Sequence, residues 1–307
     1  AGRWGLNHVK TLYSLDCIVG VVDSNKSTLN QISHIYPKCL TFSKLTHSLK
    51  DNFDAYIVST PPKTHFNIAK LIIENGKPVL VEKPFTLDLN DAIELNELAK
   101  KKNVNLMVGH LLLFHPAFKK IKQLIENKKL GEIQYIYSNR LNLGIVRSHE
   151  DVFWSLAPHD ISIIQYLCNK NPLKVSKNNH TFLNDGIADI QITNLEYSSN
   201  LKAHIFSSWY NPFKEHRLIV CGTEGFIDYK ASDDEFFTHY KSSFESLKSQ
   251  NNLVIDEGNK IFSQKNEPLK EELMYFIDNI KNGKQAEIAG PKSALETTEI
   301  MLAIQED

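Results

Sequence analysis

The chain has 307 residues, of which 42% are hydrophobic and 23% are charged, and its formal net charge is −1. These values are typical of a folded protein with room for two domains, and they exclude a global basic field that recruits nucleic acid or an anionic membrane. No apolar run reaches the ~20 residues of a membrane span. Because no signal peptide is visible either, we expect a cytoplasmic protein without a membrane partner.

The first third of the sequence alternates short β-branched runs with amphipathic stretches. Strands are expected at 17–23, 55–60, 77–83 and 103–110. Helices are expected between them, as at 64–76 and 87–101. Continuous apolar strands that alternate with helices indicate a parallel sheet covered on both faces. We therefore expect an α/β domain over residues 1–114.

Beyond about residue 130 the strand patterns become longer and alternate between apolar and polar residues. Strands are expected at 132–144, 187–199, 201–210 and 217–230. Helices are expected at 151–169, 267–282 and 291–305. Alternation of this kind predicts a large, mostly antiparallel sheet that is open on one face. We therefore expect an α+β domain over residues 115–307.

The opening segment AGRWGLNH contains part of a dinucleotide fingerprint. Gly2 and Gly5 have the spacing of the second and third glycines of G-x-G-x-x-G. The first glycine and its strand would precede Ala1, so we expect a Rossmann-type sheet without its first strand. The alternative interpretation is an ordinary glycine turn at the start of a helix.

Asp23 ends the next strand, about 20 residues after Gly2, where an acid commonly binds the adenosine ribose. A carboxylate there repels a 2′-phosphate, so the pattern favours NAD over NADP, although Lys26 nearby leaves NADP open. The alternative is an aspartate that only stabilises a turn.

Several stretches together resemble the Gfo/Idh/MocA family of oxidoreductases. They are AGRWG at the start, VVDSN at 21–25, STPPKTHF at 59–66, VEKPF at 81–85 and WSLAPHDISI at 154–163. The resemblance implies an NAD(P)-dependent dehydrogenase acting on CH–OH groups. Its first domain would bind the dinucleotide, and its second would bind substrate and form oligomers.

Within the family, the stretches at 109–125, 138–160 and 207–229 are most similar to the nucleotide-sugar 3-dehydrogenases. This branch implies oxidation of the 3-hydroxyl of a UDP-linked N-acetylhexosamine or its uronic acid, in glycan or lipopolysaccharide sugar biosynthesis. Two alternatives remain open: a dehydrogenase of a free polyol or sugar such as inositol, and a non-catalytic dinucleotide sensor.

The E-K-P motif places Lys83 at the carboxyl end of a parallel strand, where ligands lie in doubly wound sheets. An amine that is partly desolvated near an oxidised nicotinamide ring can exchange a proton close to neutral pH. The resemblance implies that Lys83 is catalytic and that the Lys83–Pro84 bond is cis. Without the family, Lys83 reads as a surface lysine at a strand end.

The P-H-D motif supplies a second catalytic candidate, His159, because imidazole has a pKa suited to general-base chemistry. The family commonly has an aspartate four residues earlier, where this chain has Ser155. A hydroxyl can bind substrate, but it cannot stabilise a cation as a carboxylate does. This departure keeps the sensor alternative open.

The remaining candidate residues follow from the resemblance. The cofactor is expected to contact Gly2, Arg3, Trp4, Gly5, Asp23, Ser24, Thr60, Pro61, His65, Glu82 and Lys83. The substrate is expected to contact His110, Arg140, Asn142, Ser155, His159 and Arg217. For Arg217, an exposed position at the edge of the sheet is an equal alternative.

The cysteines and the open sheet support two further expectations. The four cysteines show no metal-ligand spacing, so we expect buried reduced thiols and no metal site. The open face of so large a sheet needs cover, so we expect a homodimer or a homotetramer.

Overall fold

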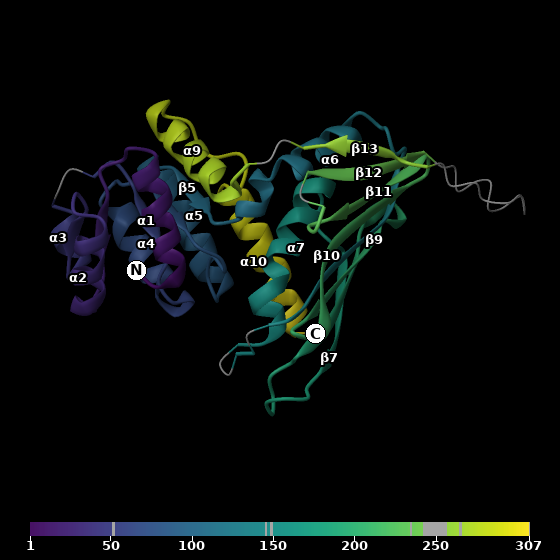
Figure 1. Cartoon of the computed structure of the whole chain (residues 1–307), viewed down its shortest axis with the longest axis horizontal. Coiled ribbons are helices and arrows are strands. Elements are labelled where there is room, and N and C mark those ends of the chain that lie inside the picture. The colour runs from purple at the N-terminus through teal and green to yellow at the C-terminus, as the bar shows by residue number, and fades with distance from the viewer. Residues whose placement is uncertain are drawn as a thin grey trace, which may run out of the picture. The chain divides into compact units, whose positions relative to one another are not determined.

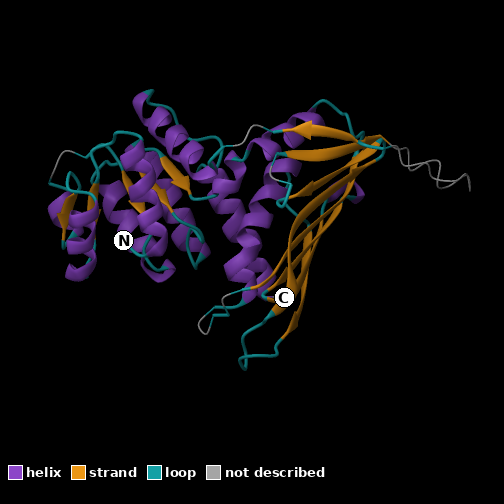
Figure 2. Ribbon diagram, in the orientation of Figure 1, coloured by secondary structure: helices purple, strands orange, loops and turns teal. Residues whose placement is uncertain are grey.

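The computed structural model describes residues 1–50, 53–144, 146–147, 150–233, 235–241, 257–263 and 266–306 (Figures 1 and 2). The chain forms two compact units. The first comprises Ala1–Leu111 together with Glu267–Thr298, and the second comprises Leu112–Asn266 together with Glu299–Asp307.

The first unit contains five short parallel strands. They are β1 (Gly20–Val22), β2 (Leu40–Phe42), β3 (Tyr56–Val58), β4 (Val79–Val81) and β5 (Leu106–Val108). β1 pairs with β2, and a second sheet has the order β3-β4-β5. Every residue of β4 and β5 is buried, as expected for apolar strands covered on both faces. The Rossmann-type parallel architecture predicted from the sequence is confirmed.

Helices of the first unit follow the strands in alternation. They are α1 (Arg3–Ser14), α2 (Lys26–Ile35), α3 (Leu45–Ser48), the 3₁₀ turn η1 (Pro62–Thr64), α4 (His65–Glu74) and α5 (Leu89–Lys102). Capping residues in the sequence set both ends of α5. The Asp88 carboxylate accepts hydrogen bonds from the backbone of Asn90 and Asp91, and Asn103 ends the helix in the left-handed conformation with φ 52°.

Two helices near the C-terminus return to this first unit. They are α9 (Pro268–Lys281) and the first half of α10 (Pro291–Glu306), up to Thr298. Their connection is fixed by the Val108 amide, which donates to the Ala289 carbonyl at 2.8 Å, and by the Asn105 side chain, which donates to the Lys284 carbonyl at 2.7 Å. The sequence pattern did not predict this return, because the amphipathicity of a helix shows that it packs on another element but does not show which one.

The second unit is built on an eight-stranded sheet with the order β13-β12-β11-β10-β6-β9-β8-β7. Its strands are β6 (Ile133–Leu143), β7 (Lys174–His180), β8 (Ile190–Glu196), β9 (Lys202–Ser208), β10 (Tyr210–Gly222), β11 (Gly225–Lys230), β12 (Phe236–Lys241) and β13 (Asn259–Phe262). All pairings are antiparallel except the central one between β6 and β9. The predicted large, mostly antiparallel sheet is confirmed.

One face of this sheet carries the helices of the unit, α6 (Pro116–Glu126) and α7 (Val152–Cys168), with the turn η2 (Leu111–Phe114) before α6 (Figures 1 and 2). α7 packs on β6, β8 and β9. Its start is fixed by Asp151, whose carboxylate accepts from the Trp154 amide at 3.0 Å. Alternate side chains of the strands, such as Ile136 and Ile205, are fully buried beneath this helix layer. Within the described residues, no helix is both long and apolar enough to cross a membrane.

Candidate functional site

The two glycines of the opening turn have different surroundings. Gly2 precedes α1 in an extended conformation, a Cβ at this position would meet nothing within 4 Å, and no side chain caps the helix. The first-turn amides are therefore available to an anionic ligand. A Cβ on Gly5 would lie 2.9 Å from the Ser59 hydroxyl, so the close approach of α1 to the end of β3 requires glycine. This division of roles matches the fingerprint and fits a bound pyrophosphate.

Asp23 lies directly after β1, beside the same turn. Its carboxylate contacts the Ala1 amino group and accepts from the Asn25 amide at 2.8 Å. Ser24 is exposed next to it, and Arg3 is exposed on the first turn of α1. The expected ribose-binding acid is therefore next to the expected pyrophosphate turn.

His65 connects two of the predicted motifs. Its ring nitrogens lie 2.8 Å from the Thr60 carbonyl oxygen and 2.9 Å from the Pro84 carbonyl oxygen, and its side chain is buried. Thr60 and Pro61 are exposed at the end of β3. The buried His65 side chain therefore connects the end of β3 to the E-K-P turn.

Glu82 points into the fold and is 5% exposed. Its Oε1 accepts hydrogen bonds from Trp4 Nε1 and from His8 Nε2, the latter at 2.7 Å. Its Oε2 accepts from the Lys83 amide at 3.2 Å, and it would lie 2.9 Å from a Cβ on Gly109. Glu82 therefore ties α1 to the ends of β4 and β5.

Lys83 follows Glu82 at the carboxyl end of β4 and is half-buried. The Lys83–Pro84 bond is cis, which confirms the expectation from the resemblance. His110, at the end of the neighbouring strand β5, is buried, and burial followed by the charge of Lys83 lowers its pKa to about 3. His110 is therefore neutral beside the candidate lysine.

In the second unit, α7 carries His159 and Ser155, which lie four residues apart and so share a face of the helix. His159 is half-buried, and Ser155 is buried. The next residue, Asp160, is 1% exposed and holds Arg140 of β6. Arg140 Nε donates to Asp160 Oδ2 at 2.5 Å, and a terminal guanidinium nitrogen of Arg140 donates to Oδ1 at 3.0 Å. The pair joins α7 to the sheet.

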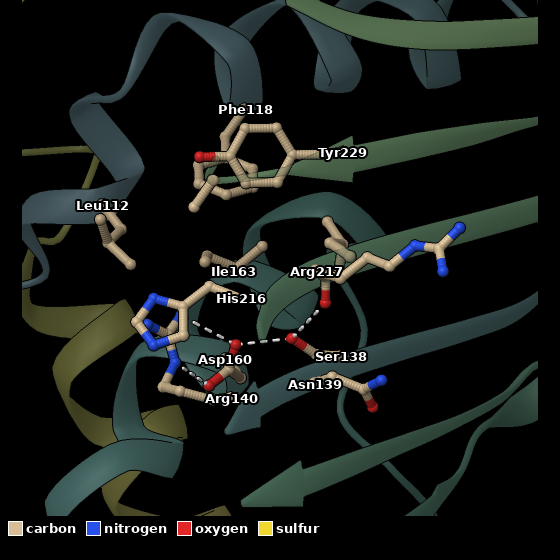
Figure 3. A pocket seen from close by; sticks show the side chains of 12 residues that line it. Leu112, Phe118, Ser138, Asn139, Arg140, Asp160, Ile163, His216, Arg217 and Tyr229 are labelled. Carbon is tan, nitrogen blue, oxygen red and sulfur yellow. Dashed lines mark hydrogen bonds and ion pairs between the residues drawn. The ribbon is translucent and has the colours of Figure 1, made fainter. Parts of the chain in front are cut away.

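A cavity of about 70 Å³ lies beside this ion pair (Figure 3). Ser138 donates to Asp160 at 2.6 Å on its floor, and His216 faces the same carboxylate from β10. Burial, followed by the charges of Arg140 and Lys214, lowers the pKa of His216 to about 4. The cavity therefore presents a neutral imidazole next to a charge-balanced pair. Its apolar wall consists of Leu112, Phe118, Ile163, Leu218 and Tyr229.

The two other predicted substrate residues of the second unit, Arg217 and Asn142, do not pair with Asp160 in the residues that the structure describes. Arg217 donates to both Asp228 oxygens at 2.8 Å, and Figure 3 shows its side chain pointing away from Asp160. Arg217 thus contributes its backbone to the cavity, where its carbonyl lies 3.5 Å from the Ser138 hydroxyl. Asn142 is half-buried two residues beyond Arg140 on β6.

Comparison with known proteins identifies the family. Residues 1–110 match the "Oxidoreductase family, NAD-binding Rossmann fold" of the GFO/IDH/MocA proteins, and residues 118–228 match the GFO/IDH/MocA C-terminal domain. The chain belongs to the Gfo/Idh/MocA family. It is therefore an NAD-binding oxidoreductase by family, as the resemblance implied.

Two of the relatives are named dehydrogenases. UDP-N-acetylglucosamine 3-dehydrogenase of Acidithiobacillus ferrooxidans is 29% identical over 175 residues, which cover 57% of this chain and 54% of that protein. The scyllo-inositol 2-dehydrogenase (NAD(+)) of Bacillus subtilis is 28% identical over 242 residues, which cover 75% of this chain and 68% of that protein. The alignment thus spans only about half of the first relative. A solved structure of the Acidithiobacillus enzyme has a TM-score of 0.85 at 20% identity, covering 99% of this chain and 95% of that one, which shows the shared fold.

This Gfo/Idh/MocA chain brings its predicted cofactor residues together in the first unit, whereas His159, Ser155 and Arg140 lie in the second. Sequence reasoning missed the residues that hold these candidates in place. His8 could have been predicted as a neighbour of Trp4, because the two residues are four apart and so share a helix face. Asp160 is the acid of the P-H-D motif, but its pairing with Arg140 could not be predicted because the two residues are distant in sequence. His216 had no signal in the sequence. Among the described residues, no group of three possible metal ligands comes together.

The buried Arg140–Asp160 pair should contribute more to stability than the Arg217–Asp228 pair. The side chains are 12% and 1% exposed in the first pair, against 33% and 12% in the second. Asp160→Asn leaves a buried guanidinium without its counter-charge and should cost about 3 kcal/mol. Asp228→Asn, the matched control, should cost about 1 kcal/mol or less. Urea unfolding followed by tryptophan fluorescence measures both, and equal losses would contradict the assignment.

Proposed function

We propose that this protein is an NAD-dependent dehydrogenase that oxidises the 3-hydroxyl of a UDP-linked N-acetylhexosamine or its uronic acid. The observation that carries the reaction type is the E-K-P turn at the end of β4, where Glu82 fastens Lys83 to the helix of the glycine turn. The choice of substrate rests on the similarity to the Acidithiobacillus 3-dehydrogenase.

The residues of the first unit suit a bound dinucleotide. The uncapped first turn of α1 would hold the pyrophosphate, and Asp23 would accept hydrogen bonds from the adenosine ribose. NAD, when bound, supplies the hydride acceptor. Thr60, Pro61 and Lys83 lie at the carboxyl ends of β3 and β4, where the family places the nicotinamide ribose.

Oxidation of an alcohol also requires a group that takes the hydroxyl proton. We assign this task to the pair His159 and Lys83, one of which accepts the single hydroxyl proton as the carbon gives up hydride. Ser155 lies one helical turn before His159, and its hydroxyl would bind the substrate without adding charge. α7 therefore carries the proposed base, His159, but at position 155 it has a serine instead of the carboxylate that is common in the family.

A second candidate substrate is a free polyol, because the scyllo-inositol dehydrogenase aligns over a larger share of this chain. The two candidates are distinguished by turnover with UDP-N-acetylglucosamine, its uronic acid and scyllo-inositol under the same conditions. Turnover of scyllo-inositol alone would replace the nucleotide-sugar assignment.

Replacing either catalytic candidate should slow turnover without preventing NAD binding. Lys83→Ala and His159→Ala should each lower kcat by ~10²-fold or more, the usual effect of removing an acid–base group. Ser155→Ala should have a smaller effect, and Ser155→Asp tests whether the family's usual carboxylate raises activity or shifts its pH optimum. The exposed residues Lys100 and His34 provide matched alanine controls. If both Lys83→Ala and His159→Ala turned over substrate nearly as fast as the parent protein, this mechanism would be refuted.

The cofactor preference should depend on Asp23. Asp23→Ser removes the charge that repels a 2′-phosphate and should narrow the preference for NAD over NADP. Asp54→Ser, in which an exposed acid before β3 loses the same charge, should leave the ratio unchanged. Fluorescence titration with NADH and NADPH measures both ratios. A parent protein that binds NADPH more tightly would show that Asp23 does not select the cofactor.

We further propose that the open face of the large sheet joins two copies of the chain. Stacked rings lie on this face: Tyr137 stacks on His204 with centroids 5.4 Å apart, and Phe226 stacks on Tyr240 at 4.6 Å. Flat, partly apolar faces of this kind form closed symmetric contacts between identical chains.

Light scattering at micromolar concentration should therefore give the mass of a dimer or tetramer. Phe206→Glu places a charge on the open face and should shift the mass toward the monomer. Ile93→Glu changes an exposed apolar residue of α5 in the first unit and should leave the mass unchanged. A parent protein that is monomeric would refute the proposed assembly.

A further inference from the structure

The carboxylate of Glu82 lies against Gly109, at the end of β5. A Cβ added to Gly109 would lie 2.9 Å from Glu82 Oε2, 3.0 Å from Cδ and 3.1 Å from Oε1, so a side chain there would have to displace the carboxylate. The carboxylate is not free to move, because its oxygens accept hydrogen bonds from Trp4, His8 and the Lys83 amide. Gly109 therefore forms part of the site that holds Glu82.

His8 holds the same carboxylate from α1. Its Nε2 lies 2.7 Å from Glu82 Oε1, and the residue is 3% exposed. The other ring nitrogen of His8, Nδ1, is buried and has no hydrogen-bond partner among the described residues. An unpaired buried polar atom destabilises a fold, so packing alone would favour an apolar residue at this position. The feature that distinguishes the imidazole from an apolar ring here is its hydrogen bond to Glu82.

The amide of Lys83 depends on this carboxylate for a hydrogen bond. The last amide that joins β4 to β3 is that of Glu82, which donates to the Val58 carbonyl at 2.9 Å. The next amide along the chain, that of Lys83, donates to the Glu82 carboxylate at 3.2 Å. The backbone of Lys83 is therefore oriented by a side chain whose own position depends on His8 and Gly109.

We propose that His8 and Gly109 are positioning residues for Lys83, and that both act through the Glu82 carboxylate. His8 supplies an N–H donor to the carboxylate, and Gly109 leaves the space that the carboxylate fills. Neither residue touches the reacting atoms. The effect on catalysis rests on the proposed function of Lys83, whereas the effect on the Lys83 backbone does not.

The backbone effect is tested by hydrogen exchange of the Lys83 amide in protein with isotope-labelled lysine, which needs neither substrate nor cofactor. His8→Phe keeps an aromatic ring but removes the donor, so this amide should exchange about tenfold faster, as expected when a hydrogen bond to a charged group is lost. His8→Gln restores an N–H donor and should recover most of the protection.

Thr11→Ala is the matched control for the His8 variants. It removes a hydrogen bond on the same helix, from the Thr11 hydroxyl to the Asn7 carbonyl at 2.8 Å, which does not involve Glu82. Exchange at Lys83 and turnover should therefore both stay at the parent values in Thr11→Ala.

Gly109→Ala disturbs the carboxylate without removing any of its donors. The added Cβ should displace the carboxylate and accelerate exchange of the Lys83 amide. Glu82→Ala removes the side chain through which Gly109 is proposed to act, so adding Gly109→Ala to Glu82→Ala should have no further effect. A further acceleration in the double variant would overturn the claim that Gly109 acts through Glu82.

The catalytic effect is tested by comparing turnover with cofactor affinity, on whichever candidate substrate the parent oxidises. His8→Phe and Gly109→Ala should each lower kcat about tenfold or more, because small displacements of a catalytic group slow the chemistry. The Kd for NADH, measured by fluorescence, should change little, since the glycine turn and Asp23 hold the cofactor. His8→Gln should recover kcat. Parallel losses of kcat and NADH affinity would indicate a structural role and overturn the positioning role.

Exchange at Lys83 that matches the parent in both His8→Phe and Gly109→Ala would overturn the proposal. If His8→Phe does not fold, Trp4→Phe replaces it, because it removes the other donor on α1 from a partly exposed position. Full turnover in Lys83→Ala would refute the proposed function while leaving the exchange results intact, so the two failures are distinguishable.

Discussion

The inward-facing carboxylate of Glu82 is the interaction on which the first unit depends. It is bound by Trp4 and His8 of α1, and it follows β4 directly. The glycine turn is therefore positioned through a side chain and not only through the backbone of its own loop. A buried charge tolerates little displacement once its donors are fixed, so the turn and Lys83 are held in register.

The second unit also contains a buried acid that accepts hydrogen bonds from several side chains. Asp160 lies on a buried face of α7 and accepts hydrogen bonds from Arg140 of β6 and from the Ser138 hydroxyl. It follows His159 directly in the sequence, so fixing its side chain fixes the rotation of α7 about its axis. In both units a candidate catalytic residue adjoins a buried acid in sequence. The buried acid fixes the local backbone geometry, and the candidate catalytic residue next to it can point its side chain in a different direction.

The sequence predicted the elements better than it predicted the contacts between them. Apolar runs such as Val79–Val81 and the caps of α5 and α7 are local signals, and these elements were found. The resemblance led us to expect that Glu82 contacts the cofactor, and no sequence pattern indicated that its oxygens also accept hydrogen bonds from Trp4, His8 and the Lys83 amide. The Arg217–Asp228 pair was readable in principle, because the Thr223–Glu224 turn sets a hairpin register that makes the two diagonal neighbours. The return of α9 to the first unit depends on packing over long sequence separations, which no local pattern encodes.

The single parallel pairing of β6 with β9 has a consequence for how the second unit folds. Parallel neighbours cannot be joined by a tight turn, so the chain between them carries α7 across one face of the sheet before β9 can pair. The other neighbour of β6 is β10, which lies still later in the sequence. The centre of the sheet therefore consists of contacts of high sequence separation, whose loop-closure entropy opposes them until most of the unit has been synthesised. The hairpin of β7 and β8 can form early, but the strand that carries Arg140 gains its partners late. Organisation of the Arg140–Asp160 cavity should thus coincide with completion of the sheet rather than precede it.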